Sequence, residues 1–274
     1  MDKIILNGKL IKESQATISI LDKGYFFDFS VYTSIKVIRG KIFFPEYHID
    51  RLFKSAQIIE LEHQFSKSDV LKWLNLLVQK NKINDVLLRV ILIGDPDCNK
   101  DAKLFIFPVT GLTYYSDEMY KKGVKVITYH GERKIPTAKA KDMLLIFLAY
   151  REAKRRGAVD ALLVDKDGNI REGTQSNFFA MKDNTIIVPP KEKVLEGITK
   201  KIVLQVTKDK FEVKERDISL SDIKNYDEFF ITSTTKNVMP INQIDDIKID
   251  SNFKRIKVVQ KLFKEYYIKL ILNQ

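Results

Sequence analysis

The stretch Asp165-Lys-Asp-Gly168-Asn-Ile-Arg171-Glu172-Gly173-Thr-Gln-Ser176-Asn177 joins the end of one strand to the next strand. Its Asp167-Gly168 pair is typical of a hairpin turn, because glycine adopts the left-handed backbone that such turns need. About thirty residues upstream, the stretch Arg133-Lys-Ile-Pro-Thr-Ala-Lys139 leads into an apolar helix. The chain is therefore organised around one lysine, Lys139, and one carboxylate, Glu172.

The composition is that of a globular protein. With 274 residues, 45% hydrophobic and 30% charged, the chain is long enough for one large or two ordinary domains. We expect no membrane span and no signal peptide, because no apolar run approaches about 18 residues and the first residues read as a strand. The single Cys98 excludes an internal disulfide and predicts a cytoplasmic protein. Three histidines and one cysteine make a structural zinc site improbable, so we expect no metal.

The net charge of +11 has two interpretations. A basic protein can bind nucleic acid, or it can simply carry a lysine-rich surface that attracts small anions. The lysines are scattered among acids, and no recognition motif or basic tail is present. We favour the second interpretation and expect no nucleic-acid or membrane partner.

Residues 1–112 read as a small α+β domain, followed by a polar linker at 113–119. Its expected elements are strands at 2–8, 10–20, 30–38, 41–44, 85–93 and 103–109, with helices at 45–60 and 67–80.

Two positions in this half are candidate ligands for anions. Tyr32 and Lys36 share one face of a strand, because strand side chains alternate with a period of two. They are either surface residues or a phenol and an ammonium that hold a carboxylate. Arg51 lies beside the buried stripe of its helix, where it is either in a surface ion pair or a phosphate ligand.

Residues 120–274 read as a larger mixed domain. Its expected elements are strands at 123–129, 160–164, 170–181, 185–188, 211–216, 228–232 and 241–249, with helices at 141–156, about 194–208 and 253–272. Lys139 comes just before the first of these helices. The positive end of the helix dipole and partial burial favour the neutral amine that a nucleophilic lysine needs.

Two turns in the larger domain are candidate anion sites. Gly197-Ile198-Thr199 starts a helix and offers free backbone N–H groups, although it is equally an ordinary helix cap. Ser233-Thr234-Thr235 places three hydroxyls at a strand end.

These residues together resemble the class IV pyridoxal-phosphate (PLP) aminotransferases, which include branched-chain and D-amino-acid aminotransferases and aminodeoxychorismate lyase. The resemblance runs nearly from end to end. It is carried by Asp28…Val31-Tyr32, His48-x-Asp-Arg51, Lys139…Leu148-Ala149, Glu172-Gly173…Ser176-Asn177, Leu195-x-Gly197-Ile198-Thr199 and Thr234…Pro240.

The resemblance implies a two-domain fold type IV enzyme with a pseudo-barrel sheet in the larger domain. It also implies a homodimer with its active site near the interface. Lys139 is similar to the lysine that holds PLP as a Schiff base, and Glu172 to the carboxylate facing the pyridine nitrogen. The implied phosphate and cofactor ligands are Arg51, Ile198, Thr199, Ser233, Thr234 and Asn177. The implied substrate residues are Tyr32, Lys36 and Thr235.

Some positions depart from the family pattern. Phe27-Asp28-Phe29 replaces Gly-Asp-Gly, Thr33 replaces a glutamate, and Gly94–Lys100 lacks an Arg-x-His carboxylate trap. The leading prediction is an aminotransferase acting on a D-amino acid or a branched-chain L-amino acid and a 2-oxo acid. The alternatives are aminodeoxychorismate lyase and, more distantly, a non-catalytic basic binding protein.

Overall fold

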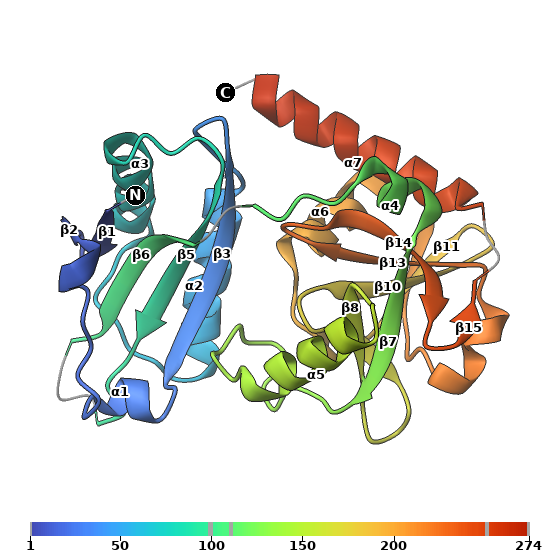
Figure 1. Ribbon diagram of the computed structural model, residues 1–274, viewed down its shortest axis with the longest axis horizontal. Helices are drawn as coiled ribbons and strands as arrows, with labels where there is room; N and C mark the ends of the chain where they lie inside the picture. The colour runs from blue at the N-terminus through green and yellow to red at the C-terminus, as the bar shows by residue number, and fades with distance from the viewer. Residues whose placement is uncertain (1, 98–100, 110–111, 250–251, 273–274) are drawn as a thin grey trace. The chain divides into compact units, whose positions relative to one another are not determined.

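The protein is described by a computed structural model that covers residues 2–97, 101–109, 112–249 and 252–272. The chain forms two compact units (Figure 1). The first unit contains Met1–Thr113 together with Ala138–Asp142, and the second contains Tyr114–Thr137 and Met143–Gln274. The segment that carries Lys139 therefore belongs to the first unit, although its neighbours in sequence belong to the second.

The first unit is a six-stranded antiparallel sheet with two long helices. The strand order is β2-β1-β6-β5-β3-β4. The elements are β1 (Lys3–Leu6), β2 (Lys9–Lys12), η1 (Glu13–Gln15), α1 (Lys23–Phe26), β3 (Ser30–Ile38), β4 (Lys41–Ile42), α2 (Pro45–Ile58), α3 (Lys67–Lys80), β5 (Val86–Ile93) and β6 (Lys103–Val109).

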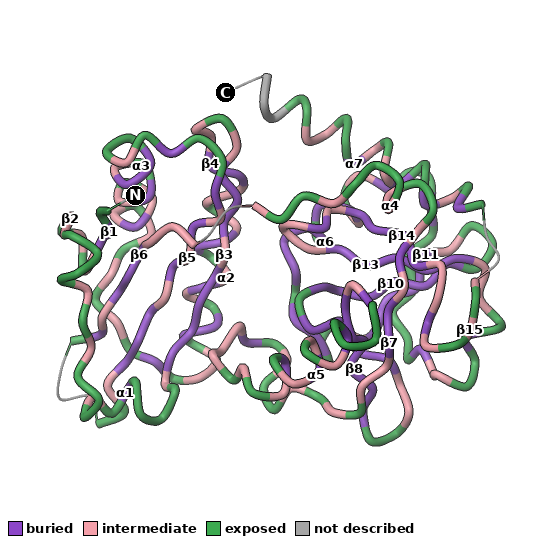
Figure 2. The backbone as a smooth tube through the Cα atoms, viewed as in Figure 1, coloured by how far each residue is buried: buried purple, intermediate pink, exposed green. Residues whose placement is uncertain are grey.

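The core of the first unit lies between one face of this sheet and α2 and α3. It is built from alternate strand residues, such as Val31 and Ile35 of β3, and from the apolar stripe of α2 at Leu52 and Ala56. Figure 2 shows long buried stretches along β3, β5 and β6. The other face of β3 therefore carries Tyr32, Ser34 and Lys36, which do not join this core.

The second unit is built on a nine-stranded sheet. Its elements are α4 (Asp117–Lys122), β7 (Val124–His130), α5 (Leu144–Arg155), β8 (Asp160–Val164), β9 (Ile170–Gly173), β10 (Asn177–Lys182), β11 (Thr185–Val188), η2 (Lys191–Lys193), α6 (Ile198–Thr207), β12 (Glu212–Glu215), η3 (Leu220–Asn225), β13 (Glu228–Ser233), β14 (Asn237–Ile244), β15 (Ile247–Lys248) and α7 (Lys254–Leu272).

Six strands of this sheet close on themselves. The sheet order runs β10-β13-β14-β7-β8-β9, and β9 pairs again with β10. This closed ring is the pseudo-barrel that the sequence implied. Its interior is filled by apolar side chains such as Phe178, Phe229 and Met239, so the ring is a packed core rather than a channel.

Four expected elements clearly differ from the structure. The strand expected at 241–249 is two strands, because β14 (Asn237–Ile244) ends at a turn at Asp245-Asp246 and β15 (Ile247–Lys248) pairs back on it. The strand expected at 10–20 ends at Lys12, because Gln15 folds back and accepts a hydrogen bond from the Lys12 N–H in a 3-10 turn. The strand expected at 170–181 is divided into β9 and β10 by a turn at residues 174–176. The hydroxyls of Thr174 and Ser176 in that turn bind Asp160, which draws the backbone out of the strand.

The helix expected at 141–156 begins only at Leu144. Residues 139–141 are extended, because they pair with β3 of the first unit: the Tyr32 N–H donates to the Lys139 carbonyl and the Lys141 N–H to the Ser30 carbonyl, both at 3.0 Å. Among the described residues, no helix has the length and apolar character needed to cross a bilayer.

Candidate active site

Lys139 is held against the start of β3, at residues 30–32. Ala140 forms an antiparallel bridge with Val31, and the Lys139 N–H donates to the Ser55 hydroxyl at 3.0 Å. The Lys139 Nζ lies 4.7 Å from the centre of the Tyr32 ring. We call the residues around it the lysine cluster: Tyr32, Thr33, His48, Arg51, Ser55 and Lys139. All six belong to the first unit.

Arg51 is fixed by two side chains that the sequence did not single out as site residues. Its Nη2 donates to the Thr33 hydroxyl at 3.0 Å, and that hydroxyl lies 2.8 Å from His48 Nδ1. Complete burial, together with the positive charges of Arg51 and Lys139, holds the pKa of His48 well below its usual value. His48 is therefore neutral and adds no further positive charge to those of Arg51 and Lys139.

Ser55 links Arg51 to Lys139. Its hydroxyl donates to the Arg51 carbonyl at 2.7 Å and accepts from the Lys139 N–H. The predicted phosphate ligand and the predicted reactive lysine are thus tied through one buried serine of α2.

The face of β3 that carries Tyr32 also has an arginine beside it, Arg89, which no sequence pattern indicated. It stands opposite Ser34 in the β3–β5 pairing, so its side chain shares a face with Tyr32 and Lys36. Its Cζ lies 5.0 Å from the centre of the Tyr32 ring, and its buried Nε has no hydrogen-bond partner among the described residues. Desolvation lowers the pKa of Lys36 to about 8. Two basic side chains, Lys36 and Arg89, therefore share this face with the Tyr32 phenol.

Glu172 is assembled with Asn177 in the second unit. The two residues stand directly opposite each other in the β9–β10 pairing, and Asn177 stands opposite Thr232 in the β10–β13 pairing. Opposite residues share a face of a sheet, so the three side chains form one row. All three are buried, and the Thr232 hydroxyl has no hydrogen-bond partner among the described residues.

Arg133 is the charge partner of Glu172, and no sequence pattern pointed to it. Its Nε donates to Glu172 Oε1 at 2.8 Å and its Nη2 donates to the Thr174 carbonyl at 3.2 Å. The other oxygen of Glu172 accepts from the Leu195 N–H at 3.3 Å. Each carboxylate oxygen can accept a further hydrogen bond, so Glu172 keeps the capacity to bind one more donor.

The start of α6 is held next to this row. Asn177 donates to the Leu195 carbonyl at 2.7 Å, so Glu172 and Asn177 both form hydrogen bonds with the backbone of Leu195. Gly197 is the N-cap of α6 and provides no side-chain cap, and the first turn contains no acidic residue. The N–H groups of Ile198 and Thr199 are therefore available to an anion.

The turn that carries the three hydroxyls of Ser233, Thr234 and Thr235, here called the hydroxyl turn, joins β13 to β14. Ser233 pairs with Asn237 at the base of the turn, and Ser233 lies one residue beyond Thr232 of the buried row. The Ser233 hydroxyl lies 3.4 Å from the Thr235 hydroxyl and accepts from the Lys236 N–H at 3.0 Å.

We call the residues of the second unit that these contacts bring together the carboxylate cluster: Arg133, Glu172, Asn177, Leu195, Gly197, Ile198, Thr199, Thr232, Ser233, Thr234 and Thr235. Lys139 and Glu172 lie in different units, so the two clusters are described separately.

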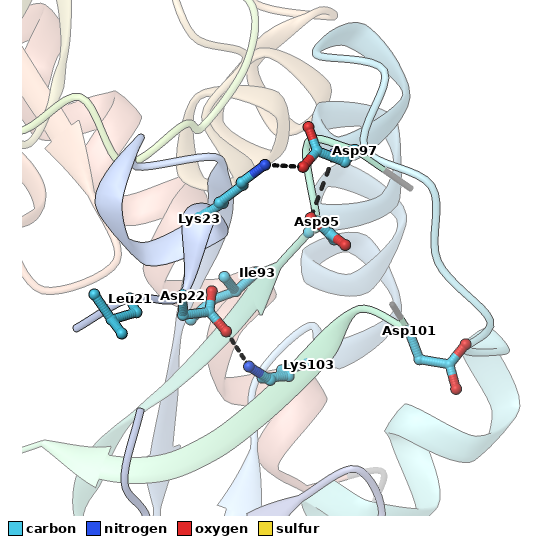
Figure 3. Close-up of a pocket in the computed structure, with 9 residues that line it drawn as sticks. Leu21, Asp22, Lys23, Ile93, Asp95, Asp97, Asp101 and Lys103 are labelled. Atoms are coloured by element: carbon cyan, nitrogen blue, oxygen red, sulfur yellow. Dashed lines mark hydrogen bonds and ion pairs between the residues drawn. The ribbon is translucent and has the colours of Figure 1, made fainter. Parts of the chain in front are cut away.

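A hollow of about 260 Å³ lies elsewhere on the first unit (Figure 3). It is lined by four aspartates and two lysines, and Lys23 pairs with Asp97 while Lys103 pairs with Asp22. It contains none of the predicted site residues, and its acidic lining does not suit a phosphate or a substrate carboxylate. Residues 98–100 of the Gly94–Lys100 stretch, which lacks the Arg-x-His trap, lie outside the described residues.

The two clusters and the closed ring define a class of protein: an enzyme with the fold of type IV PLP enzymes. The sequence profile of the family described as amino-transferase class IV matches residues 30–244. The chain therefore belongs to the class IV aminotransferases and is a PLP-dependent enzyme.

Three relatives illustrate this membership. A putative branched-chain-amino-acid aminotransferase of Methanocaldococcus jannaschii is 30% identical over 97% of this chain and 95% of its own. A D-alanine aminotransferase of Listeria monocytogenes serotype 4b is 30% identical over 99% and 96%. A branched-chain amino acid aminotransferase from T.th., solved with pyridoxamine 5'-phosphate, is 25% identical over 96% and 93%, with a TM-score of 0.87. These similarities support an aminotransferase and do not favour the lyase.

The residues present fit PLP. A pyridine nitrogen needs a carboxylate, and a phosphate needs free N–H groups and hydroxyls. The carboxylate cluster supplies Glu172, the uncapped start of α6 and the unpartnered Thr232 hydroxyl close together. The lysine cluster supplies an amine and a guanidinium.

Replacing Gly197 with alanine tests the start of α6. An added Cβ would lie 1.9 Å from Asn177 Oδ1, so the helix start and Asn177 must separate. We expect the dissociation constant for PLP to rise roughly tenfold or more, which corresponds to the loss of one hydrogen bond to a charged group. Titration of the apoenzyme with PLP measures this dissociation constant in the variant and in the wild type.

Gly157→Ala is the control for that variant. Gly157 has φ of +67° and nothing within 4 Å of an added Cβ. Alanine there costs roughly 1–2 kcal/mol of backbone strain without touching the site. Unchanged PLP affinity in Gly197→Ala would remove the start of α6 from the phosphate site.

Proposed function

We propose that this aminotransferase moves the amino group of a D-amino acid or a branched-chain L-amino acid to a 2-oxo acid, using Lys139 as the reactive lysine and Glu172 as the partner of the cofactor ring. One observation carries the assignment of the cofactor residues. Glu172 and Asn177 face each other and both hold Leu195, so a buried carboxylate stands beside an uncapped helix start. That combination suits a cofactor with a ring nitrogen at one end and a phosphate at the other.

PLP, when bound, supplies a ring that draws electrons away from the substrate α-carbon. Glu172 would hold a proton on the ring nitrogen through its remaining hydrogen-bonding capacity, while Arg133 fixes the orientation of its carboxylate. Ile198, Thr199, Ser233 and Thr234 of the second unit would bind the phosphate.

Lys139 moves the proton at the substrate α-carbon. Its amine stands over the face of Tyr32, and its backbone is fixed by hydrogen bonds to Tyr32 and Ser55. A proton carrier must return to the same place in each turnover, so a rigid backbone at Lys139 serves this role.

The basic face of the first unit is the proposed carboxylate site for the substrate. Tyr32, Lys36 and Arg89 share this face. A phenol with two cations suits the α-carboxylate of an amino acid and the carboxylate of a 2-oxo acid.

The charge of Lys36 predicts a pH dependence. The pKa of Lys36 is about 8, so its ammonium is charged below that pH and becomes neutral above it. We expect the KM for the amino acid to rise as the pH increases through about 8. Lys36→Arg stays charged, so its KM should remain flat over that range. Identical profiles in the two enzymes would remove Lys36 from the carboxylate site.

A panel of amino donors tests the proposed substrates. The enzyme is incubated with D-alanine, L-leucine or L-glutamate and a 2-oxo acid, and the new 2-oxo acid is measured. Turnover of D-alanine or L-leucine supports the proposal and identifies the enantiomer. Absence of transfer from every donor, together with consumption of aminodeoxychorismate, would replace the proposal with the lyase.

A homodimer with its active site near the interface is also proposed. Between β2 and β3 the first unit exposes four large apolar side chains: Ile20, Leu21, Phe26 and Phe27. Several exposed apolar side chains in one short segment are a feature of protein interfaces. Sedimentation velocity should give a dimer that Phe26→Asp weakens, and a monomeric wild type at micromolar concentration would contradict the proposal.

We also propose a cytoplasmic location, which the single cysteine supports. Detection of the protein mainly in the membrane or secreted fraction of cells would contradict it.

A further inference from the structure

Lys236 is a lysine buried deep in the second unit. Its side chain is 1% exposed, and its Nζ lies 3.3 Å from Oδ2 of Asp160, which is fully buried. Burial alone pulls the pKa of Lys236 down, but the charge of Asp160 raises it above its usual value overall. Lys236 is therefore protonated, and the two residues form a buried ion pair. Such pairs are costly to desolvate, so they are weak contributors to stability compared with apolar packing.

The aspartate of this pair holds the turn that carries Glu172 and Asn177. Asp160 accepts hydrogen bonds from the hydroxyl of Thr174, from the Thr174 N–H at 3.1 Å and from the Ser176 hydroxyl at 2.8 Å. The packing leaves little freedom, because a Cβ on Gly173 would lie 2.2 Å from Ser176 Oγ and 3.0 Å from Asp160 Oδ2. Glu172 and Asn177 flank this turn on either side.

Lys236 directly follows the hydroxyl turn, which carries the proposed phosphate ligands Ser233 and Thr234. Its N–H donates to the Ser233 hydroxyl at 3.0 Å. The two turns are joined at their bases by the Asn177–Thr232 strand pairing. The ion pair makes a second connection, beyond the ends of those strands.

We propose that the Asp160–Lys236 ion pair is a positioning device that fixes the hydroxyl turn relative to Glu172 and Asn177, so that the ligands of the cofactor ring and phosphate keep a constant spacing. This inference rests on the proposed roles of those residues. Neither Asp160 nor Lys236 touches the cofactor in this account. Both act through the turns that they hold.

Lys236→Met tests the device, and Arg171→Met is its matched control. Arg171 forms a similarly buried pair with Asp165 in the same unit and also pairs with the exposed Asp217. It precedes Glu172 on a strand, so its side chain points to the opposite face. Both variants should lower the melting temperature of the apoenzyme. Only Lys236→Met should raise the dissociation constant for PLP, by roughly tenfold or more.

The double variant Asp160→Asn/Lys236→Met separates positioning from the penalty of a buried, unpaired charge. It contains no uncompensated charge, so its melting temperature should recover towards wild type, while its PLP affinity stays weak. Recovery of both the melting temperature and the PLP affinity in the double variant would overturn the inference. The loss in Lys236→Met would then come only from the unpaired charge of Asp160. Equal losses of PLP affinity in Lys236→Met and Arg171→Met would also overturn it.

Ser176→Ala keeps the test decisive if Lys236→Met does not fold. It removes one hydroxyl from Asp160 and leaves the ion pair intact. A several-fold loss of PLP affinity is expected, and wild-type affinity would contradict the inference. Wild-type protein that fails to bind PLP would instead count against the proposed function, so the two failures are distinguishable.

Discussion

Lys139→Ala should reduce amino transfer by on the order of 10⁴-fold or more, because the enzyme loses the amine that moves the proton at the α-carbon. The fold should persist, since the backbone N–H and carbonyl of residue 139 make the hydrogen bonds to Ser55 and Tyr32. Amino-acid turnover measures the loss of amino transfer, and circular dichroism measures whether the fold persists. Borohydride reduction in the presence of PLP should label the wild-type peptide that contains Lys139.

Lys141→Ala is the control for Lys139→Ala. Lys141 lies two residues further along the same extended segment and pairs with Asp28 at 2.8 Å. Its loss should leave turnover close to wild type. Comparable losses in both variants, or borohydride labelling of a different lysine, would transfer the catalytic role away from Lys139.

Glu172→Gln should bind PLP and lose roughly 100-fold or more in turnover, because a neutral amide does not stabilise a proton on the ring nitrogen. The substitution also leaves Arg133 without its carboxylate partner at a buried position, so the melting temperature should fall. Steady-state turnover and thermal unfolding separate the two consequences.

Glu228→Gln distinguishes a catalytic loss from a structural one. Glu228 is also buried in the second unit, where it accepts from the Arg255 and Ile256 N–H groups at the start of α7. Its replacement should lower the melting temperature and leave turnover per folded enzyme unchanged. Glu172→Gln with wild-type turnover would remove Glu172 from its role at the ring.

Local sequence patterns predicted most elements of this fold. The strand at 30–38 and the helix at 67–80 have the expected bounds, because their alternation, apolar spacing and caps are contained within a few neighbouring residues. Some residues of the carboxylate cluster were also predicted from the sequence, since Glu172, Asn177 and the start of α6 belong to short motifs, whereas Arg133 and Thr232 were not. The division into domains at 1–112, 113–119 and 120–274 stays a prediction.

The features that the sequence did not predict depend on distant contacts. Residues 139–141 pair with β3, more than a hundred residues earlier in the chain, so the start of α5 was placed too early. The turn at 174–176 exists because two hydroxyls bind Asp160. Arg133, Arg89 and Lys236 look like ordinary surface cations in a chain with 47 lysines and arginines, and only the fold shows which of them are buried or facing Tyr32.

A single half-reaction tests whether the enzyme uses Lys139 to transfer the amino group of a donor to PLP. The enzyme loaded with PLP is mixed with an excess of one amino donor and no acceptor, and pyridoxamine 5'-phosphate and the new 2-oxo acid are quantified after denaturation. The account predicts about one equivalent of each per Lys139 for the correct donor, and neither product from Lys139→Ala. Failure of every amino donor to yield pyridoxamine 5'-phosphate from a PLP-loaded enzyme would contradict it.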